Sequence, residues 1–165
     1  MNLDAGGIAL ARYGYTPTVT SGQDLSLVTW IDGATRMVRG TRISDAGLPL
    51  DIPGLNFGSA GVFETASVFD EHAFFVTATA RTDQGMMLTI TSLDEHGGAP
   101  VHVRDFLLEK LSPSAYSTGL WPAATRVGSG ARLLYARVGG EDSDRVKRVY
   151  SRPLSSRAAG ARRGL

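Results

Sequence analysis

The sequence predicts an all-β protein made of repeated antiparallel sheets, and three observations support this prediction. First, the chain repeats itself about every 48 residues: the run that starts at Leu3-Asp4 returns at Leu50-Asp51. Second, each repeat holds short runs of alternating apolar residues, separated by turns rich in glycine, aspartate and serine. Third, 42% of the 165 residues are hydrophobic, which is enough to bury a core of ordinary size. A fixed period in this range marks an array in which each unit buries its apolar face against the next.

The first complete unit, residues 15–58, shows the plan of the repeat most clearly. Asp32-Gly33 is a preferred hairpin turn and separates the second strand from the third. Pro49 and Pro53 interrupt the fourth strand, and proline confines a strand to the edge of a sheet. Four strands are therefore expected, over residues 17–20, 25–31, 37–43 and 48–57.

The rest of the chain follows this plan less closely. Central strands equivalent to residues 25–31 are expected over 73–80 and 132–138, with Leu27-Val28-Thr29-Trp30 matched to Leu133-Leu134-Tyr135-Ala136 in the last unit. Apolar residues at helical spacing after Asp105 predict one or two helical turns. The expected divisions are a partial unit over 3–14, unit two over 59–103, an insert over 104–121, unit three over 122–154 and a disordered basic tail over 155–165.

Four short antiparallel strands in each repeat of this length are typical of β-propeller blades. The chain resembles the blade repeat of bacterial surface or secreted β-propellers in its first unit, and in outline in the other two. The resemblance implies an extracytoplasmic protein with an interaction role, and it implies no reaction. It is carried by Pro17, Val19, Ser21, Gly22, Leu27, Val28, Trp30, Asp32, Gly33, Val38, Gly40, Arg42, Ile43, Gly47, Leu50 and Asp51.

About three blades are expected, whereas closed propellers have typically 4–8. Three arrangements are consistent with this number. The chain is an open arc that belongs to a longer protein, several copies form a homo-oligomer that closes a ring, or the units fold as a single antiparallel sandwich or barrel. A Leu-Asp element at residues 3–10 repeats the fourth strand of unit one, and it could complete the last blade of the array.

The distribution of charge and the absence of cysteine exclude several classes of function. Residues 1–125 hold 7 basic and 13 acidic side chains, a difference of −6, and residues 126–165 hold 10 and 3, a difference of +7. Half of the basic end lies in strand-like sequence with a solvated face, so nucleic acid is not expected as a partner. Without cysteine there is no disulfide, thiolate metal site or cysteine nucleophile. The sequence predicts neither a signal peptide nor a membrane span in this chain.

The residue types that most often carry chemistry do not form a recognisable motif. His72, His96 and His102 lie at expected turns or strand ends, and their spacing does not match a zinc site. Ser129 lies between two glycines in a turn rather than in a nucleophile elbow. The acidic run at 141–144 lacks the calcium-loop pattern and is expected to be a solvated hairpin tip. We therefore expect no catalytic residue, metal site or cofactor.

The sequence favours a non-catalytic binding module whose ligand is a protein or a glycan. The alternative is part of a larger propeller hydrolase, with Asp32, Asp83 and Asp142 at equivalent hairpin tips and further blades or subunits completing the site. Trp30 is expected to be buried between neighbouring units, whereas Trp121 lies after the insert and is expected to be exposed.

Overall fold

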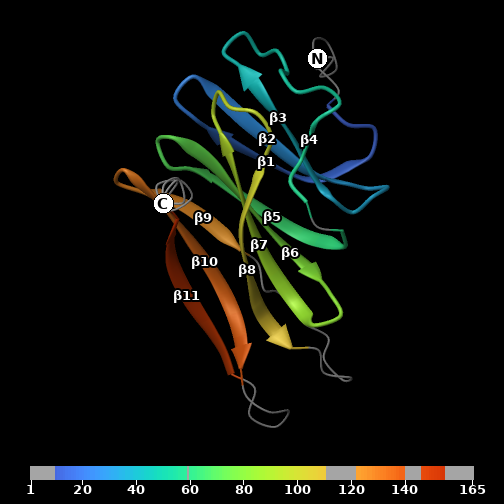
Figure 1. The fold of residues 1–165 in the computed structure, drawn as a ribbon, viewed down its shortest axis with the longest axis vertical. Helices are drawn as coiled ribbons and strands as arrows, with labels where there is room; N and C mark the ends of the chain where they lie inside the picture. Colours follow the sequence, from blue (N-terminus) through green and yellow to red (C-terminus); the bar gives the residue numbers. More distant parts are fainter. Residues whose placement is uncertain (1–9, 59, 111–121, 140–145, 155–165) are drawn as a thin grey trace, which may run out of the picture.

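The described residues form three antiparallel sheets, and none of them is helical (Figure 1). The structure, a computed structural model, describes residues 10–58, 60–110, 122–139 and 146–154. Sheet A contains β1 (Gly14–Ser21), β2 (Leu25–Asp32), β3 (Val38–Ser44) and β4 (Leu55–Asn56). Sheet B contains β5 (Val62–Phe69), β6 (Ala73–Arg81), β7 (Gly85–Asp94) and β8 (Val101–Lys110). Sheet C contains β9 (Ala123–Val127), β10 (Gly130–Gly139) and β11 (Val146–Leu154).

The strands of each sheet follow one another in sequence order, so each sheet is a simple meander. The all-β prediction is confirmed, and the three expected central strands are β2, β6 and β10, each the second strand of its sheet. The Leu-Asp element at residues 3–9, Trp121, the acidic run at 141–144 and the tail at 155–165 lie outside the described residues. Nor does the described part of the chain contain a helix long and apolar enough to cross a membrane.

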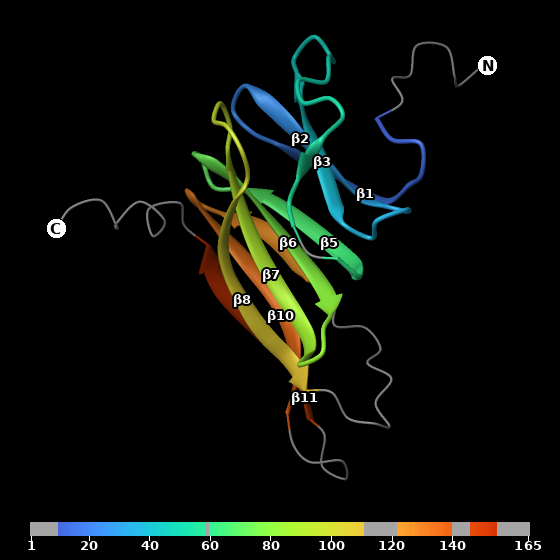
Figure 2. The ribbon, with the colours of Figure 1, turned by 45° about the vertical axis from the view of Figure 1, so that its right-hand side comes forward.

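Sheet B lies between the other two sheets, as the fanned ribbons of Figures 1 and 2 show. The first strands of the three sheets are neighbours, because β5 contacts both β1 and β9. Apolar residues cover both faces of sheet B, and β6 is buried along almost its whole length. The A–B core comprises Leu27, Ile31, Val38, Phe57, Val62, Phe69, Phe74, Val76, Ala78, Ala80 and Leu93. The B–C core comprises Val68, Phe75, Leu88, Ile90, Leu108, Ala131, Leu133, Tyr135 and Leu154.

The turn between the first and second strands fixes which residues are equivalent in the three sheets. Leu25 of sheet A and Ala73 of sheet B each close this turn through a carbonyl that accepts a backbone hydrogen bond, and Gly130 pairs with Val127 at the same place in sheet C. Val28 is three residues after Leu25 on β2, and Leu133 is three residues after Gly130 on β10, so these two residues are equivalent. The sequence alignment of unit three was therefore wrong by one residue, a shift that exchanges the two faces of a strand.

Trp30 is buried as predicted, with 5% of its surface exposed, but its location differs from the prediction. Side chains alternate along β2, and Leu27 and Ile31 point into the A–B core, so Trp30 points to the opposite face of sheet A. Two glycines lie against its ring: a Cβ atom would be 3.0 Å from it at Gly14 and 3.3 Å at Gly54. The indole is therefore covered by the start of β1 and by the segment before β4, and not by the neighbouring sheet.

The predicted helical turns after Asp105 are wrong, because residues 101–110 form β8. A short apolar run is compatible with either structure, and pairing along β7 decides in favour of a strand. Leu108 is fully buried in the B–C core and Phe106 packs against it, which fits alternation along a strand. The fourth strand of unit one is shorter than predicted, only Leu55–Asn56, because the prolines before it have no N–H to donate.

Candidate functional site

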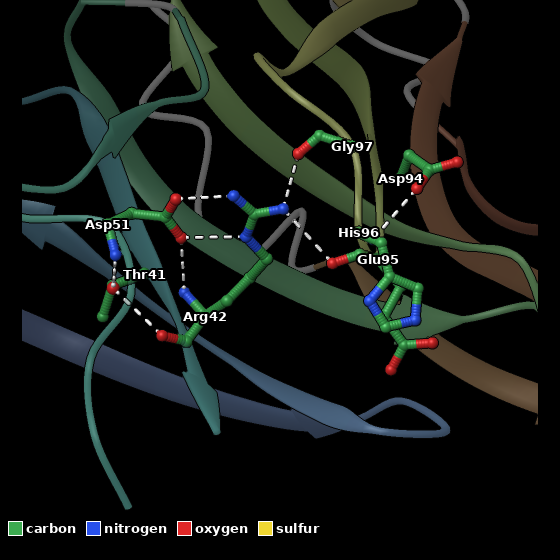
Figure 3. A network of polar contacts seen from close by, with 7 residues as sticks. All are labelled: Thr41, Arg42, Asp51, Asp94, Glu95, His96 and Gly97. Atoms are coloured by element: carbon green, nitrogen blue, oxygen red, sulfur yellow. Dashed lines mark hydrogen bonds and ion pairs between the residues drawn. The ribbon is translucent and has the colours of Figure 1, made fainter.

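An ion pair at the edge of sheet A begins the polar network shown in Figure 3. Arg42 on β3 donates from Nε and Nη2 to the two carboxylate oxygens of Asp51, at 3.0 and 2.7 Å. The backbone N–H of Arg42 also donates to this carboxylate, at 2.9 Å. The backbone N–H of Asp51 donates to the hydroxyl of Thr41. Such two-pronged pairing fixes both side chains in one geometry.

The same guanidinium joins sheet A to sheet B. Nη1 of Arg42 donates to the carbonyl oxygens of Glu95 and Gly97 in the turn between β7 and β8, at 3.2 and 2.5 Å. Oε1 of Glu95 accepts from the N–H of Asp24, in the turn between β1 and β2, and from that of Leu25, at the start of β2, at 2.8 and 2.9 Å. We call Arg42, Asp51 and Glu95 the polar clasp. Arg42 of sheet A donates to sheet B, Glu95 of sheet B accepts from sheet A, and Asp51 holds Arg42 in place.

Burial would raise the pKa of the Asp51 carboxyl, but the hydrogen bonds from the side chain and backbone of Arg42 outweigh this effect. The pKa of Asp51 therefore lies below its ordinary value. The hydrogen bond to Asp51 raises the pKa of Arg42 in turn. Burial alone raises the pKa of Glu64 on β5. Ionisation of Glu64 therefore lowers the stability of the folded protein, whereas ionisation of Asp51 raises it.

We predict that the polar clasp weakens in acid. Because the pKa of Asp51 is lower in the folded protein, the unfolded chain binds more protons, and stability falls as the pH drops below about 4. Asp51→Asn should flatten this part of the curve of unfolding free energy against pH, measured by urea denaturation. Asp45→Asn, at an exposed turn in the same sheet, serves as the control. Equal acid slopes for Asp51→Asn and the parent protein would contradict the assignment.

Asp24, Glu95 and His96 place three ligand atoms within 4.8 Å of one another, the spacing of a metal site. The geometry has a simpler cause. Glu95 is 3% exposed, and its Oε1 already accepts two backbone hydrogen bonds. His96 Nε2 lies 3.1 Å from Asp24 Oδ2, and both of these side chains are well exposed. The group thus holds two turns together, and we assign no metal to it.

A hollow of about 430 Å³ lies between sheets A and B. Most of its residues on β7 and β8 are farther from the turn between these strands than the polar clasp. Sheet A contributes the residues at and after β4, and sheet B contributes residues of β7, of β8 and of the turn between them. The lining residues are Asn56, Phe57, Gly58, Thr89, Thr91, Pro100, His102 and Asp105. Polar side chains from two sheets therefore converge on one space.

Three contacts position the polar groups of the hollow. The backbone N–H of Gly58 donates to Oδ1 of Asn56 at 2.9 Å. Thr91 donates from its hydroxyl to the carbonyl oxygen of Phe57 at 3.1 Å, a buried bond that ties the two walls together. His102 Nε2 lies 3.4 Å from Asp105 Oδ2, and both side chains are about half exposed. The imidazole and the carboxylate can therefore reach a molecule in the hollow as well as each other.

The other candidate residues from the sequence lie in or beside turns where the structure describes them. His72 is exposed in the turn between β5 and β6, and Ser129 lies in the turn between β9 and β10. Asp32 accepts hydrogen bonds at Oδ1 from the backbone of Ala34 and from Thr35, so it organises the turn after β2. These bonds lower its pKa. Asp83 is exposed in the equivalent turn of sheet B, and Asp142 lies outside the described residues.

Sequence reasoning missed both the hollow and the contacts between the sheets. Arg42 and Asp51 belong to the repeat, so an interaction between them could have been inferred from their opposite charges. Asn56, Thr89 and Thr91 carry no such signal, because they are ordinary strand residues that only the packing of two sheets brings together. His102 was seen only as a variable strand-end residue.

A scan against protein-family models and a search among curated proteins found no match to this chain. The proposals below therefore rest on its own residues and geometry.

Proposed function

We propose that the chain is a binding module of the β-propeller type that takes a small glycan in the hollow between sheets A and B. The observation that carries this proposal is the lining of the hollow, in which polar side chains from two sheets surround about 430 Å³. A volume of this size falls within the range of roughly 300 to 1,000 Å³ usual for small-molecule sites.

The chemistry of the lining matches sugar hydroxyls, each of which both donates and accepts hydrogen bonds. The amide of Asn56 does both, the carboxylate of Asp105 accepts, and the imidazole of His102 donates from one nitrogen and accepts at the other. Phe57 is 3% exposed, so it supports the wall and offers little surface for stacking. We therefore expect recognition through hydrogen bonds and modest affinity.

The propeller arrangement is supported by two features of the stack. Each of sheets A and B is a meander of four strands, and the first strands of all three sheets lie next to one another. This is the order in which blades are arranged around a propeller axis. In such an array the space between adjacent sheets repeats, which makes an inter-sheet hollow a natural binding position.

Binding is tested by screening the protein on a glycan array and then titrating the best sugar by calorimetry. We predict that His102→Ala and Asn56→Ala each weaken binding by about 5- to 150-fold, the effect of one lost polar contact of about 1 to 3 kcal/mol. His72→Ala removes an exposed histidine from another turn of sheet B and should leave binding unchanged.

Two results would count against the proposal. One is the absence of binding to any arrayed glycan. The other is binding that His102→Ala and Asn56→Ala leave intact while both variants keep the circular dichroism spectrum and thermal midpoint of the parent protein.

A further inference from the structure

The two ends of the stack expose aliphatic side chains at positions where the middle sheet is buried or partly buried. On sheet C, Val149 is 73% exposed and Leu134 is 36% exposed. On sheet A, Val19 is 68% exposed, and its cross-strand neighbour Val28 is partly exposed. In the part of the chain that the structure describes, no further sheet packs on these two faces, and on the rear of sheet A Gly14 and Gly54 cover only the ring of Trp30.

Equivalent strand positions form the contact between sheets A and B and the contact between sheets B and C. We call the face of a sheet that packs on the next sheet in the chain its front, and the opposite face its rear. Val38 of sheet A and Leu88 of sheet B are equivalent front residues, and both are fully buried by the next sheet. Val149 occupies the same position in sheet C, since it pairs with Ala136 as Val38 pairs with Ile31.

The rear faces follow the same rule. Val76 of sheet B and Leu133 of sheet C are equivalent rear residues, 2% and 0% exposed, and each packs against the preceding sheet. Val28 has this position in sheet A. Val19 beside it corresponds to Ser67 of β5, whose hydroxyl meets those of Thr18 and Thr20 on the front of sheet A.

We propose that a second copy of this chain docks on the front of sheet C with the rear of its sheet A. The contact would repeat the A–B and B–C contacts already present within one chain, with Val149 and Leu134 packed on Val19 and Val28. It is a head-to-tail contact between two different surfaces, which either closes into a ring or continues as an open series.

Two arginines must be accommodated in this contact: Arg39, which pairs with Trp30 on the rear of sheet A, and Arg132 on the front of sheet C. Arg132 stands on the front of sheet C at the position of Leu27 and Phe75, and its Nη1 donates to the hydroxyl of Ser151 at 3.3 Å. An arginine can lay its aliphatic stem along an apolar surface and keep its charged group at the rim. Both arginines are therefore compatible with docking, and their charges are expected at the edge of the interface.

The test is light scattering of the full chain over a range of concentrations. We expect the parent protein to form species of two or more copies, and Val149→Glu and Val19→Glu each to raise the dissociation constant at least tenfold. Val101→Glu places the same charge on β8, at a side chain that is 57% exposed and on neither end face, so it should associate like the parent.

A mixture of the two variants gives the sharpest result. Val149→Glu keeps an intact sheet A, and Val19→Glu keeps an intact sheet C, so together they should form a pair through one remaining contact. A parent protein that stays monomeric at its highest soluble concentration would overturn the proposal. So would association that neither variant weakens. This inference does not depend on glycan binding, which calorimetry on the monomer reports separately.

Discussion

Trp30→Ala is expected to lower the free energy of unfolding by about 3 to 5 kcal/mol, the usual effect of emptying a large aromatic site. The indole is 5% exposed and is enclosed by Gly14 and by the segment that contains Gly54. Neither glycine has a side chain that could fill the space left by the indole. The measurement is urea or guanidinium denaturation, with the slope of the transition checked for constancy.

The control for this prediction is Trp30→Phe, which keeps most of the apolar volume and should cost less than Trp30→Ala. A loss below about 1 kcal/mol for the alanine variant falls in the range of surface substitutions. It would show that the ring faces solvent and that the placement of Gly54 against the ring is wrong.

Arg42→Ala should cost about 3 kcal/mol, because it leaves the Asp51 carboxylate partly buried without its counter-ion. It also removes the donor to the carbonyls of Glu95 and Gly97, which connect sheet A to sheet B. Arg81→Ala is a suitable control, since this arginine is exposed at the end of β6. Denaturation at neutral pH gives both values.

A double-mutant cycle with Asp51→Ala separates the ion pair from the contact between the sheets. If Arg42 acted only through Asp51, the double variant would be no less stable than Asp51→Ala alone. We expect it to be less stable, because the turn carbonyls of sheet B lose their donor in either background. If the loss of unfolding free energy in the double variant equals the sum of the losses in the two single variants, the two side chains do not interact.

The central strands could be predicted from local chemistry. Turn residues such as Asp32-Gly33 and the alternation of apolar residues in β2 and β6 depend only on neighbours along the chain. The alignment of β10 depended on a short match of apolar residues, and such a match cannot distinguish the two faces of a strand. Only the pairing of Val127 with Gly130 fixed the register.

The predictions that were wrong concerned long-range contacts. Phe106 and Leu108 fit a helix or a strand until β7 is placed beside them. Trp30 was placed between units, because the sequence could not show that Gly54 folds back over its ring. The hollow could not be predicted for the same reason: residues 56–58 and 89–105 are far apart in sequence, and no motif links them.

The measurement that tests the account most directly is an NMR titration of the labelled protein with the best sugar from the glycan array. We expect amide shifts to concentrate at Asn56–Gly58 and at Thr89, Thr91, His102 and Asp105, on the two walls of the hollow. Shifts confined to one sheet, or gathered at the turns that hold Asp24 and His96, would contradict a binding site formed between sheets A and B.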